Sequence, residues 1–578
     1  MSIWKKRNSS IKTLDEFVEK SVNMPLSKFL NPTPDPYIKD LAEAVAFVKE
    51  SIAKGNKVSV VADYDADGVM GAAILKMVIE EYTGNVPYVR IPKRRAEGYG
   101  LSMNIVDEID SGLVITVDNG IAAVDQVAKA KAKGLDVVVL DHHGIREDGL
   151  IPKADVVVDP SAIPGSAFND YCGAALAYRF AKELIPNSKN LDKMLVFASI
   201  ATVADVMELV GDNRNIVRRG LELVNQRKVT QGFNTLLNVL NVNYANEETY
   251  GFKIGPVINA SGRLFDDGPD DVLRLITNDC NVFDDDQMAA NEELAKVLEK
   301  RNTMRQDMVK NHMAIAHQII EEQNLTDNAI MMVYSPDFDE GIVGIVAGNL
   351  TEEYHRPAIA FTDGKKAGVM KGSARNYGDT HMKEMCDYAK ELFLSSVNDK
   401  GEISYAYGGH KGAAGMSVPK ENLDALRNKM NEYLKNTGFD YEAESDTTYY
   451  DLELPEIKVT ETIKRLNELA PFGQGNPRPI FKIEGYSLAP KGADFVKVMG
   501  KDKNHLKFFG KYTDAVGFDM VKAYEEAGRP KTMNVLGNLS QNFYQGKFYN
   551  QIEVLEFEPI TVETKTKTMK TLEDLLIF

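Results

Sequence analysis

The chain has 578 residues, of which 44% are hydrophobic and 26% charged, and its formal net charge is −17. This length exceeds what one hydrophobic core supports and predicts several domains of an ordinary globular protein. The acidic balance counts mildly against a nucleic-acid partner, but it does not exclude one, because clustered carboxylates that hold divalent cations are offset by the metal.

The cysteines and the N-terminus limit the compartment. Cys172, Cys280 and Cys386 lie far apart, which excludes a disulfide framework and a cysteine-based zinc site. The sequence therefore predicts a reducing compartment, the cytoplasm. The first ten residues have no apolar segment behind their basic residues, and no apolar run is long enough to span a bilayer, so we expect neither a signal peptide nor a membrane partner.

The first 45 residues contain Pro32, Pro34 and Pro36 and predict an extended lead-in, followed by a helix through Lys54. Five short apolar runs come next, separated by segments typical of helices. They cover residues 58–63, 86–92, 112–118, 135–141 and 154–159. This alternation predicts a doubly wound α/β domain with a parallel sheet over residues 46–235.

Carboxylates and imidazoles follow three of these runs. Asp63, Asp65 and Asp67 end the first run, Asp118 ends the third, and His142 and His143 follow the fourth. Helix capping would explain one such group, but the carboxyl ends of parallel strands converge on one crevice. Aspartate and histidine without cysteine suit Mn²⁺ or Mg²⁺, and this many ligands fit two ions. The pattern predicts two-metal hydrolysis of a phosphate ester or anhydride.

Four motifs resemble those of the DHH phosphoesterase superfamily. They are Asp63–Gly68, Val117–Gly120, Asp141–His143 and Ala204–Val206. Further blocks resemble, in order, those of its RecJ family of single-strand-specific 5′→3′ DNA exonucleases; they begin at Ile91, Gly255, Gly341, Gly372, Gly408 and Leu469. The resemblance runs from about residue 50 to 560.

The resemblance implies a role for each candidate residue. The implied metal ligands are Asp65, Asp67, Asp118, His142 and Asp205. His143 is implied to be a ligand or a contact to the scissile phosphate. Some members carry a metal-binding histidine where this chain has Val61, so Asp63 either compensates or orients the loop, and we favour orientation. The implied phosphate contacts are Arg94, Arg263, Ser373, Arg375 and His410.

The remainder of the chain predicts further domains. Residues 236–325 predict a helical connector, with apolar positions at 3–4 spacing that indicate one long helix over 281–323. Residues 326–436 predict a second α/β domain, which the resemblance identifies as DHH-associated. A linker follows, and residues 447–562 contain short β-type runs typical of a small barrel, implied to be an OB-fold.

The barrel region and the C-terminus predict contacts to partners. Aromatic residues at 508, 509, 518, 543, 544, 548 and 549, with Lys547, are candidates to stack bases of single-stranded DNA, although several must belong to the core. Residues 563–578 form a Thr/Lys spacer with an apolar end. They predict a packed terminal segment or, alternatively, a docking peptide for a partner such as a single-strand-binding protein or a helicase.

The sequence favours a monomeric, metal-dependent 5′→3′ exonuclease that degrades single-stranded DNA to mononucleotides in repair and recombination. One alternative is an oligoribonuclease or small phosphoesterase of the same superfamily, which needs neither the barrel nor the long helix. The other is an inactive replication scaffold, which would be expected to have lost ligands that are all present here.

Overall fold

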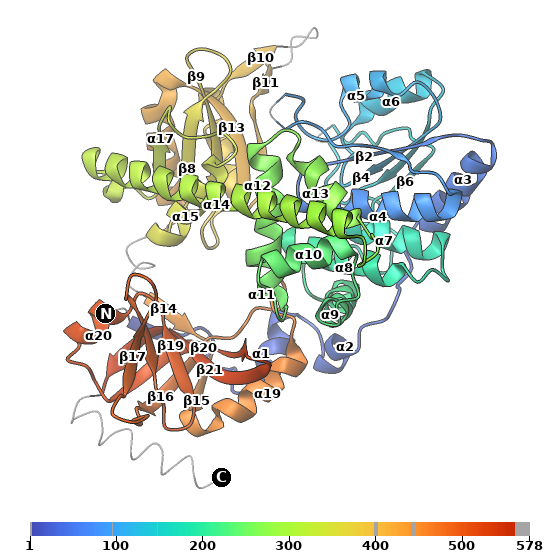
Figure 1. Ribbon diagram of the computed structural model, residues 1–578. Helices are drawn as coiled ribbons and strands as arrows, with labels where there is room; N and C mark the ends of the chain where they lie inside the picture. The colour runs from blue at the N-terminus through green and yellow to red at the C-terminus, as the bar shows by residue number, and fades with distance from the viewer. Residues whose placement is uncertain (1–2, 95, 147, 398–402, 441–446, 561–578) are drawn as a thin grey trace. The chain divides into compact units, whose positions relative to one another are not determined.

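The computed structural model describes residues 3–94, 96–146, 148–397, 403–440 and 447–560. The chain forms two compact units (Figure 1). Unit 1 comprises Met1–Ile3 and Lys300–Thr448, and unit 2 comprises Trp4–Glu299 and Tyr449–Phe578. Residues 441–446 of the expected linker and the tail 563–578 lie outside the described residues.

The first sheet of unit 2 confirms the predicted doubly wound fold. Its five strands are all parallel and lie in the order β3-β2-β4-β5-β6. They are β2 (Val58–Ala62), β3 (Tyr88–Arg90), β4 (Leu113–Val117), β5 (Asp136–Leu140) and β6 (Val156–Val158). The chain moves from β3 on one side of β2 to β4 on the other, so the topological switch point lies between β2 and β4.

Helices cover both faces of this sheet (Figure 1). On one face, Val60 and Ile115 pack against α3 (Leu41–Ala53), α4 (Ala66–Thr83) and α7 (Gly173–Leu184). On the other, Val61 and Val114 pack against α5 (Met103–Glu108) and α6 (Val124–Ala132). Neighbouring strand residues point to opposite faces, which explains why the buried strands are apolar throughout.

A helical region completes this part of unit 2. It contains α8 (Leu191–Ala204), α9 (Gly211–Asn225), α10 (Gln231–Val239), α11 (Glu247–Thr249), a π-helical turn (Tyr250–Ile254), α12 (Gly255–Leu264) and α13 (Gly268–Thr277). The predicted long helix is α14 (Asp285–Glu322), with 38 residues. Its residues belong partly to each unit, because the boundary between the units falls at Lys300.

Unit 1 is a second α/β fold around a five-stranded sheet. The order is β12-β13-β9-β8-β7, formed by β7 (Met331–Tyr334), β8 (Ala358–Asp363), β9 (Val369–Arg375), β12 (Tyr407–Gly409) and β13 (Ala413–Pro419). Met385 and Met430 of α16 (Met382–Tyr388) and α17 (Leu423–Asn436) pack on one face. Helix α15 (Val343–Tyr354) contacts β8 and β9. Strands β10 (Ser395–Val397) and β11 (Ile403–Tyr405) form a separate exposed pair.

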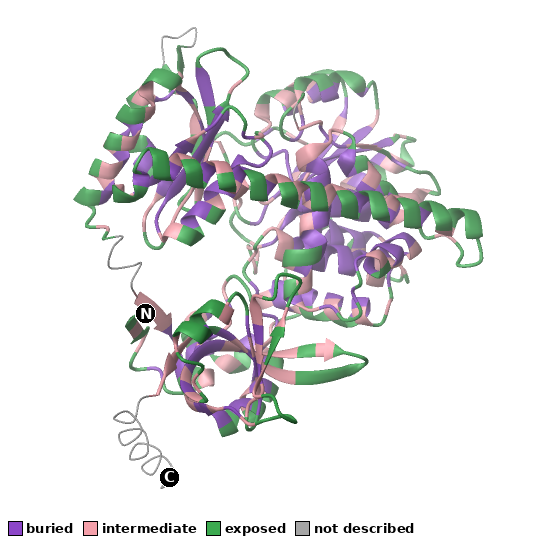
Figure 2. Ribbon diagram, turned by 60° about the vertical axis from the view of Figure 1, so that its left-hand side comes forward, coloured by how far each residue is buried: buried purple, intermediate pink, exposed green. Residues whose placement is uncertain are grey.

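The C-terminal part of unit 2 is the expected β-domain. Its seven-stranded sheet has the order β15-β16-β20-β21-β19-β18-β17. The shorter strands are β15 (Leu452–Pro455), β16 (Phe481–Ser487), β17 (Val496–Met499), β18 (His505–Phe508) and β19 (Asp514–Gly517). The other two strands, β20 (Thr532–Tyr544) and β21 (Lys547–Pro559), are longer than predicted because they pair as one continuous hairpin. Helices α19 (Val459–Leu469) and α20 (Val521–Glu526) were not predicted. Figure 2 shows the buried inner side and the exposed outer side of this sheet.

The N-terminal lead-in differs from the prediction. It is not extended, because it contains α1 (Leu14–Ser21) and α2 (Leu26–Leu30). Thr13 and Glu16 form a capping box that starts α1. Pro32, Pro34 and Pro36 come only after α2 has ended. Phe17 and Phe29 are buried in the hydrophobic core of the β-domain, so packing against distant residues stabilises these short helices.

Within the described residues no helix has both the length and the apolarity needed to cross a bilayer. The three cysteines are free.

Candidate metal centre

The candidate residues meet where β2, β4 and β5 end. The register aligns Ala62 with Val117 and Val117 with Leu140, so the next residues, Asp63, Asp118 and Asp141, leave the sheet at one level. Three residues after the last residue of β2, Asp65 caps α4, and Asp67 lies in the first turn of this helix. Asp205 arrives from another direction, at the C-terminal cap of α8.

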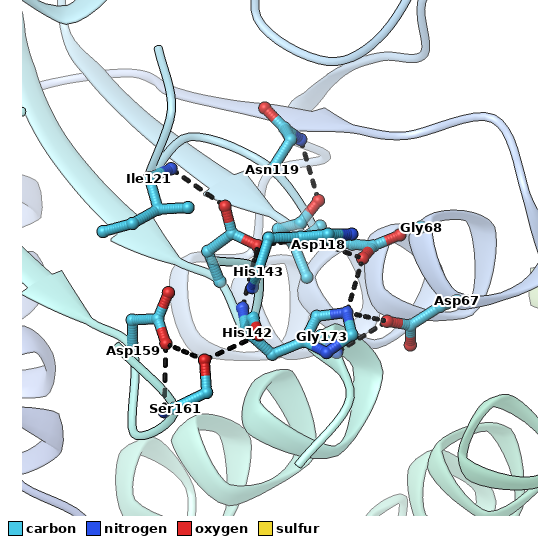
Figure 3. A network of polar contacts seen from close by, with 12 residues as sticks. Asp67, Gly68, Asp118, Asn119, Ile121, His142, His143, Asp159, Ser161 and Gly173 are labelled. Atoms are coloured by element: carbon cyan, nitrogen blue, oxygen red, sulfur yellow. Dashed lines mark hydrogen bonds and ion pairs between the residues drawn. The ribbon is translucent and has the colours of Figure 1, made fainter. Parts of the chain in front are cut away.

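His142 lies at the middle of the cluster (Figure 3). Its Nε2 atom is 3.1 Å from Asp118 Oδ1, 3.5 Å from Asp67 Oδ2 and 3.6 Å from Asp205 Oδ2. Asp67 and Asp118 are almost completely buried, whereas Asp205 is partly exposed. The cluster therefore opens to solvent beside Asp205.

Three overlapping groups have ligand atoms close enough to share a cation. The groups are Asp63–Asp65–Asp118, Asp67–His142–Asp205 and Asp118–His142–His143, and within each group the ligand atoms lie within 4.8 Å of one another. The structure thus brings together all seven residues predicted for the metal centre. Because Asp118 and His142 each belong to two groups, the arrangement suits adjacent cations that share ligands.

Backbone groups hold the buried carboxylates in place. The N–H groups of Gly173 and Ala174, at the start of α7, donate to the two oxygens of Asp67 at 2.6 and 2.8 Å. Position 173 must be glycine, because a Cβ there would lie 2.7 Å from the Cβ of Asp118. The positive end of the α7 dipole also favours the negative charge of Asp67.

Asp141 belongs to a motif that the sequence analysis named, but it was given no role there, and the structure places it against His143. Asp141 is buried, accepts a hydrogen bond from the Ile121 N–H at 2.8 Å, and lies 2.8 Å from Nδ1 of His143. Burial lowers the pKa of His143, but the hydrogen bond and the charge of Asp141 outweigh it and raise this pKa to about 9. The position of Asp141 directly before two histidines was a usable signal.

A second polar network supports the His142 backbone. The Ser161 hydroxyl donates to the carbonyl oxygen of His142 at 2.7 Å, and Asp159 accepts the N–H groups of Ser161 and Ala162 (Figure 3). Asp159 directly follows β6, as Asp141 directly follows β5. Ligand-supporting contacts of this kind orient a histidine in a metal site.

The electrostatics of the cluster favour a bound cation. Burial, and after it repulsion by neighbouring carboxylates, raises the pKa of Asp63 and of Asp205 to about 8 and that of Asp118 well above its usual value. Asp63 Oδ1 is buried and has no hydrogen-bond partner among the described residues. Divalent cations would satisfy this oxygen and offset the repulsion, and an Asp/His donor set fits Mn²⁺ or Mg²⁺.

Two of the predicted phosphate contacts lie in unit 2. The guanidinium of Arg94 lies over the ring of Tyr64, 4.9 Å from its centroid. Tyr64 is the residue between Asp63 and Asp65 in the sequence. Arg263 is in the last turn of α12. Helix α12 also supports the segment from Asp63 to Asp67, called the aspartate loop below, because Asn259 Oδ1 accepts the N–H of Ala66 at 2.8 Å.

The other three lie in unit 1, where they share one sheet. Arg375 Nη1 donates to Ser373 Oγ at 2.9 Å, and both project from β9. Burial lowers the pKa of Arg375, which forms no ion pair with a carboxylate within the described part of the chain. Gly344 in α15 leaves room for it, since a Cβ there would lie 2.9 Å from Arg375 Nη2. His410 is exposed, just after β12.

The structure separates the aromatic residues that the sequence left undivided. Phe508 is fully buried in the core of the β-domain. Phe518, Tyr544, Phe548 and Tyr549 are each about half exposed. Tyr544 and Tyr549 line one pocket of about 190 Å³ together with Lys507.

Comparisons with known proteins match three parts of the chain. The DHH family, N-terminal domain, matches residues 57–207, the DHHA1 domain matches residues 327–436, and the RecJ OB domain matches residues 450–556.

Relatives of similar architecture are known. The single-stranded-DNA-specific exonuclease RecJ of Bacillus subtilis is 31% identical over 90% of this chain, which spans 64% of the Bacillus protein. The enzyme of the same name from Haemophilus influenzae is 29% identical over 94% of both chains. The crystal structure of Thermus thermophilus RecJ in complex with Mn²⁺ has the same fold, with a TM-score of 0.73 at 24% identity, over 95% of this chain and 76% of that one. The chain therefore belongs to the DHH family, in the RecJ group that combines DHH, DHHA1 and RecJ OB domains.

Proposed function

We propose that this protein is a metal-dependent 5′→3′ exonuclease that hydrolyses single-stranded DNA to mononucleotides and serves repair and recombination. The observation that carries the proposal is the cluster in which Asp118 and His142 are each shared by two potential cation-binding groups. The relatives that match most of the chain are named single-stranded-DNA-specific exonucleases, which supports the substrate class.

The proposed metal ligands are Asp65, Asp67, Asp118, His142 and Asp205. Bound Mn²⁺ or Mg²⁺ would supply Lewis acidity at the phosphodiester and activate water. Asp63 orients the aspartate loop through its position at the end of β2. His143, held by Asp141 at 2.8 Å and more exposed than His142, contacts the scissile phosphate.

Arg94, Arg263, Ser373, Arg375 and His410 are proposed as phosphate contacts. The support is strongest for Arg375, because a half-buried guanidinium that pairs with no carboxylate among the described residues gains from an anionic ligand. Ser373 adds a hydroxyl 2.9 Å away, and the first turn of α15 lies beside both. For Arg94, the support is its fixed place over Tyr64.

Tyr544 and Tyr549 are proposed to stack bases of the single strand. Each exposes about half of its surface, and Lys507 lies in the same pocket to meet the backbone. Stacking on aromatic side chains is largely independent of base sequence, as a nuclease that degrades any single strand requires.

A substrate comparison tests this function against the small-phosphoesterase and scaffold alternatives. Single-stranded DNA labelled at the 5′ or the 3′ end, duplex DNA, a dinucleotide and pyrophosphate are each incubated with Mn²⁺ or Mg²⁺, and Asp118→Asn serves as the inactive control. We expect mononucleotides only from the long single strand, with the 5′ label released first. Preferred cleavage of the dinucleotide or pyrophosphate would select the small-phosphoesterase function, and no turnover would select the scaffold.

We further propose that the protein acts as a monomer. We propose the cytoplasm as its compartment, which the free cysteines support. A single-strand-binding protein or a helicase is the proposed partner, because either would present single strands to the enzyme. Light scattering tests the oligomeric state, and pull-down with each purified candidate tests the partner.

A further inference from the structure

We propose that Tyr99 is a positioning residue that, together with Asp141, holds His143 in its working orientation. The inference rests on the proposed function, in which His143 contacts the substrate. Tyr99 is not among the proposed ligands or phosphate contacts, and about half of its surface is exposed at the rim of the cluster.

The hydroxyl of Tyr99 makes contacts in two directions. It donates its proton to the backbone carbonyl oxygen of Asp118 at 2.7 Å. Its oxygen also contacts the imidazole of His143, whose Nδ1 and Nε2 atoms lie 3.2 and 3.3 Å away. The two rings meet edge to face, with centroids 5.6 Å apart and planes at 75°.

Asp141 and Tyr99 together restrain the ring of His143. Asp141 takes the Nδ1 position at 2.8 Å, and the phenol oxygen lies at almost equal distances from both nitrogens, which places it over the face of the planar ring. Rotation of the imidazole about its Cβ–Cγ bond would change both contacts. A catalytic group held by its neighbours in this way needs little reorganisation during the reaction.

The backbone beside Tyr99 is also attached to the metal centre. The N–H of Leu101 donates to Asn119 Oδ1 at 3.1 Å, and Asn119 Nδ2 donates to the carbonyl oxygen of Val117 at 2.9 Å. Gly100 has φ of +58° and approaches Asn119 so closely that a Cβ would lie 2.7 Å from the Asn119 Cβ. Tyr99 is therefore fixed relative to β4 and presents its hydroxyl to His143 from a rigid support.

The test compares Tyr99→Phe with Tyr88→Phe. Tyr88 is a matched control on β3, and its hydroxyl lies 3.5 Å from Glu108 of α5. We expect Tyr99→Phe to lower kcat about 10-fold with KM for single-stranded DNA unchanged, because substrate still binds while His143 loses one restraint. Mn²⁺ affinity, measured by calorimetry, should change by less than about threefold, since the phenol hydroxyl bonds to the backbone carbonyl of Asp118 and to no carboxylate oxygen of the described residues. The control should match the unaltered protein.

A spectroscopic readout separates this role from a purely structural one. The chain has eight histidines, so labelling their Cε1 atoms gives few NMR signals, and His143→Ala assigns the one of interest. The His143 signal should shift and broaden in metal-free Tyr99→Phe. An unchanged His143 signal, an unchanged kcat, or a loss of Mn²⁺ affinity that parallels the loss of kcat would overturn the proposal. The NMR result is independent of turnover, so failure of the proposed exonuclease function is recognised separately.

Discussion

The carboxylate of Asp67 accepts the backbone N–H of Gly173 at 2.6 Å, across 106 residues of sequence. This contact joins the first turn of α4 to the first turn of α7, and it leaves the charge of Asp67 directed at His142. Both oxygens of Asp67 are engaged, because Ala174 donates to the second one at 2.8 Å.

Asp67→Asn should therefore lower nuclease activity at least about 100-fold, since loss of the charge weakens cation binding. Asp67→Ala should in addition lose about 1–3 kcal/mol of unfolding free energy, because two buried N–H groups lose their acceptor. Activity assays and urea unfolding in the presence of a chelator measure the two effects. Asp125→Asn, at an exposed carboxylate on α6, is the control and should change neither quantity. Full activity in Asp67→Asn would contradict the ligand assignment.

Metal removal should abolish activity and lower stability. A ligand that binds only the native state stabilises it by about 2.7 kcal/mol at 100 times its Kd. Mn²⁺ added to chelator-treated protein should therefore raise the unfolding midpoint and restore activity together, as followed by thermal unfolding at increasing Mn²⁺. Asp118→Asn removes a residue that belongs to two of the three cation-binding groups and should show little Mn²⁺-dependent shift. An equal shift in Asp118→Asn would place the stabilising ion elsewhere.

Arg375→Ala should slow cleavage of 5′-phosphorylated strands about 10–100-fold, since a charge-assisted hydrogen bond contributes about 1.5–3 kcal/mol. Unphosphorylated strands and Mn²⁺ affinity should be affected far less. Arg375→Lys keeps the charge but not the bidentate geometry and should recover only part of the rate. Initial rates on the two kinds of 5′ end measure the effect. An equal loss on both ends would remove Arg375 from the phosphate contacts.

Arg214→Ala should destabilise the protein without touching the metal centre. Arg214 is completely buried, donates to the carbonyl oxygens of Leu469 and Glu468 at 2.8 and 3.0 Å, and stacks on Phe29 at 4.1 Å. The substitution removes the Arg214 donor from the Glu468 carbonyl and leaves the Leu469 carbonyl with Asn476 Nδ2 alone, which should cost about 1–3 kcal/mol in urea unfolding.

Arg219→Ala is the matched control on the same helix. Arg219 is exposed and pairs only with Glu222 among the described residues, so its loss should cost less than about 0.5 kcal/mol. Equal effects of the two substitutions would mean that the buried contacts of Arg214 contribute little.

Several features followed from the sequence because they obey general rules of chain geometry. Apolar runs that alternate with helical segments form a parallel sheet, and residues after its strands meet at one edge. Asp63, Asp118 and His142 could be placed together on that ground alone. Asp205 required the resemblance to a known family, because nothing in a helix end 62 residues after His143 indicates where it will lie.

Other features depended on partners that no local pattern identifies. Residues 14–30 fold as helices because Phe17 and Phe29 find an apolar surface in a β-domain that begins more than 400 residues later. Phe508 and Tyr549 are equally suited to a core or to a base, and only the curvature of the sheet buries the first and exposes the second. Asp141 and Tyr99 acquired their roles because folding placed both against His143. Local sequence thus determined which backbone elements form and which chemical groups they carry, whereas burial and pairing were decided by surfaces that exist only once the chain has folded.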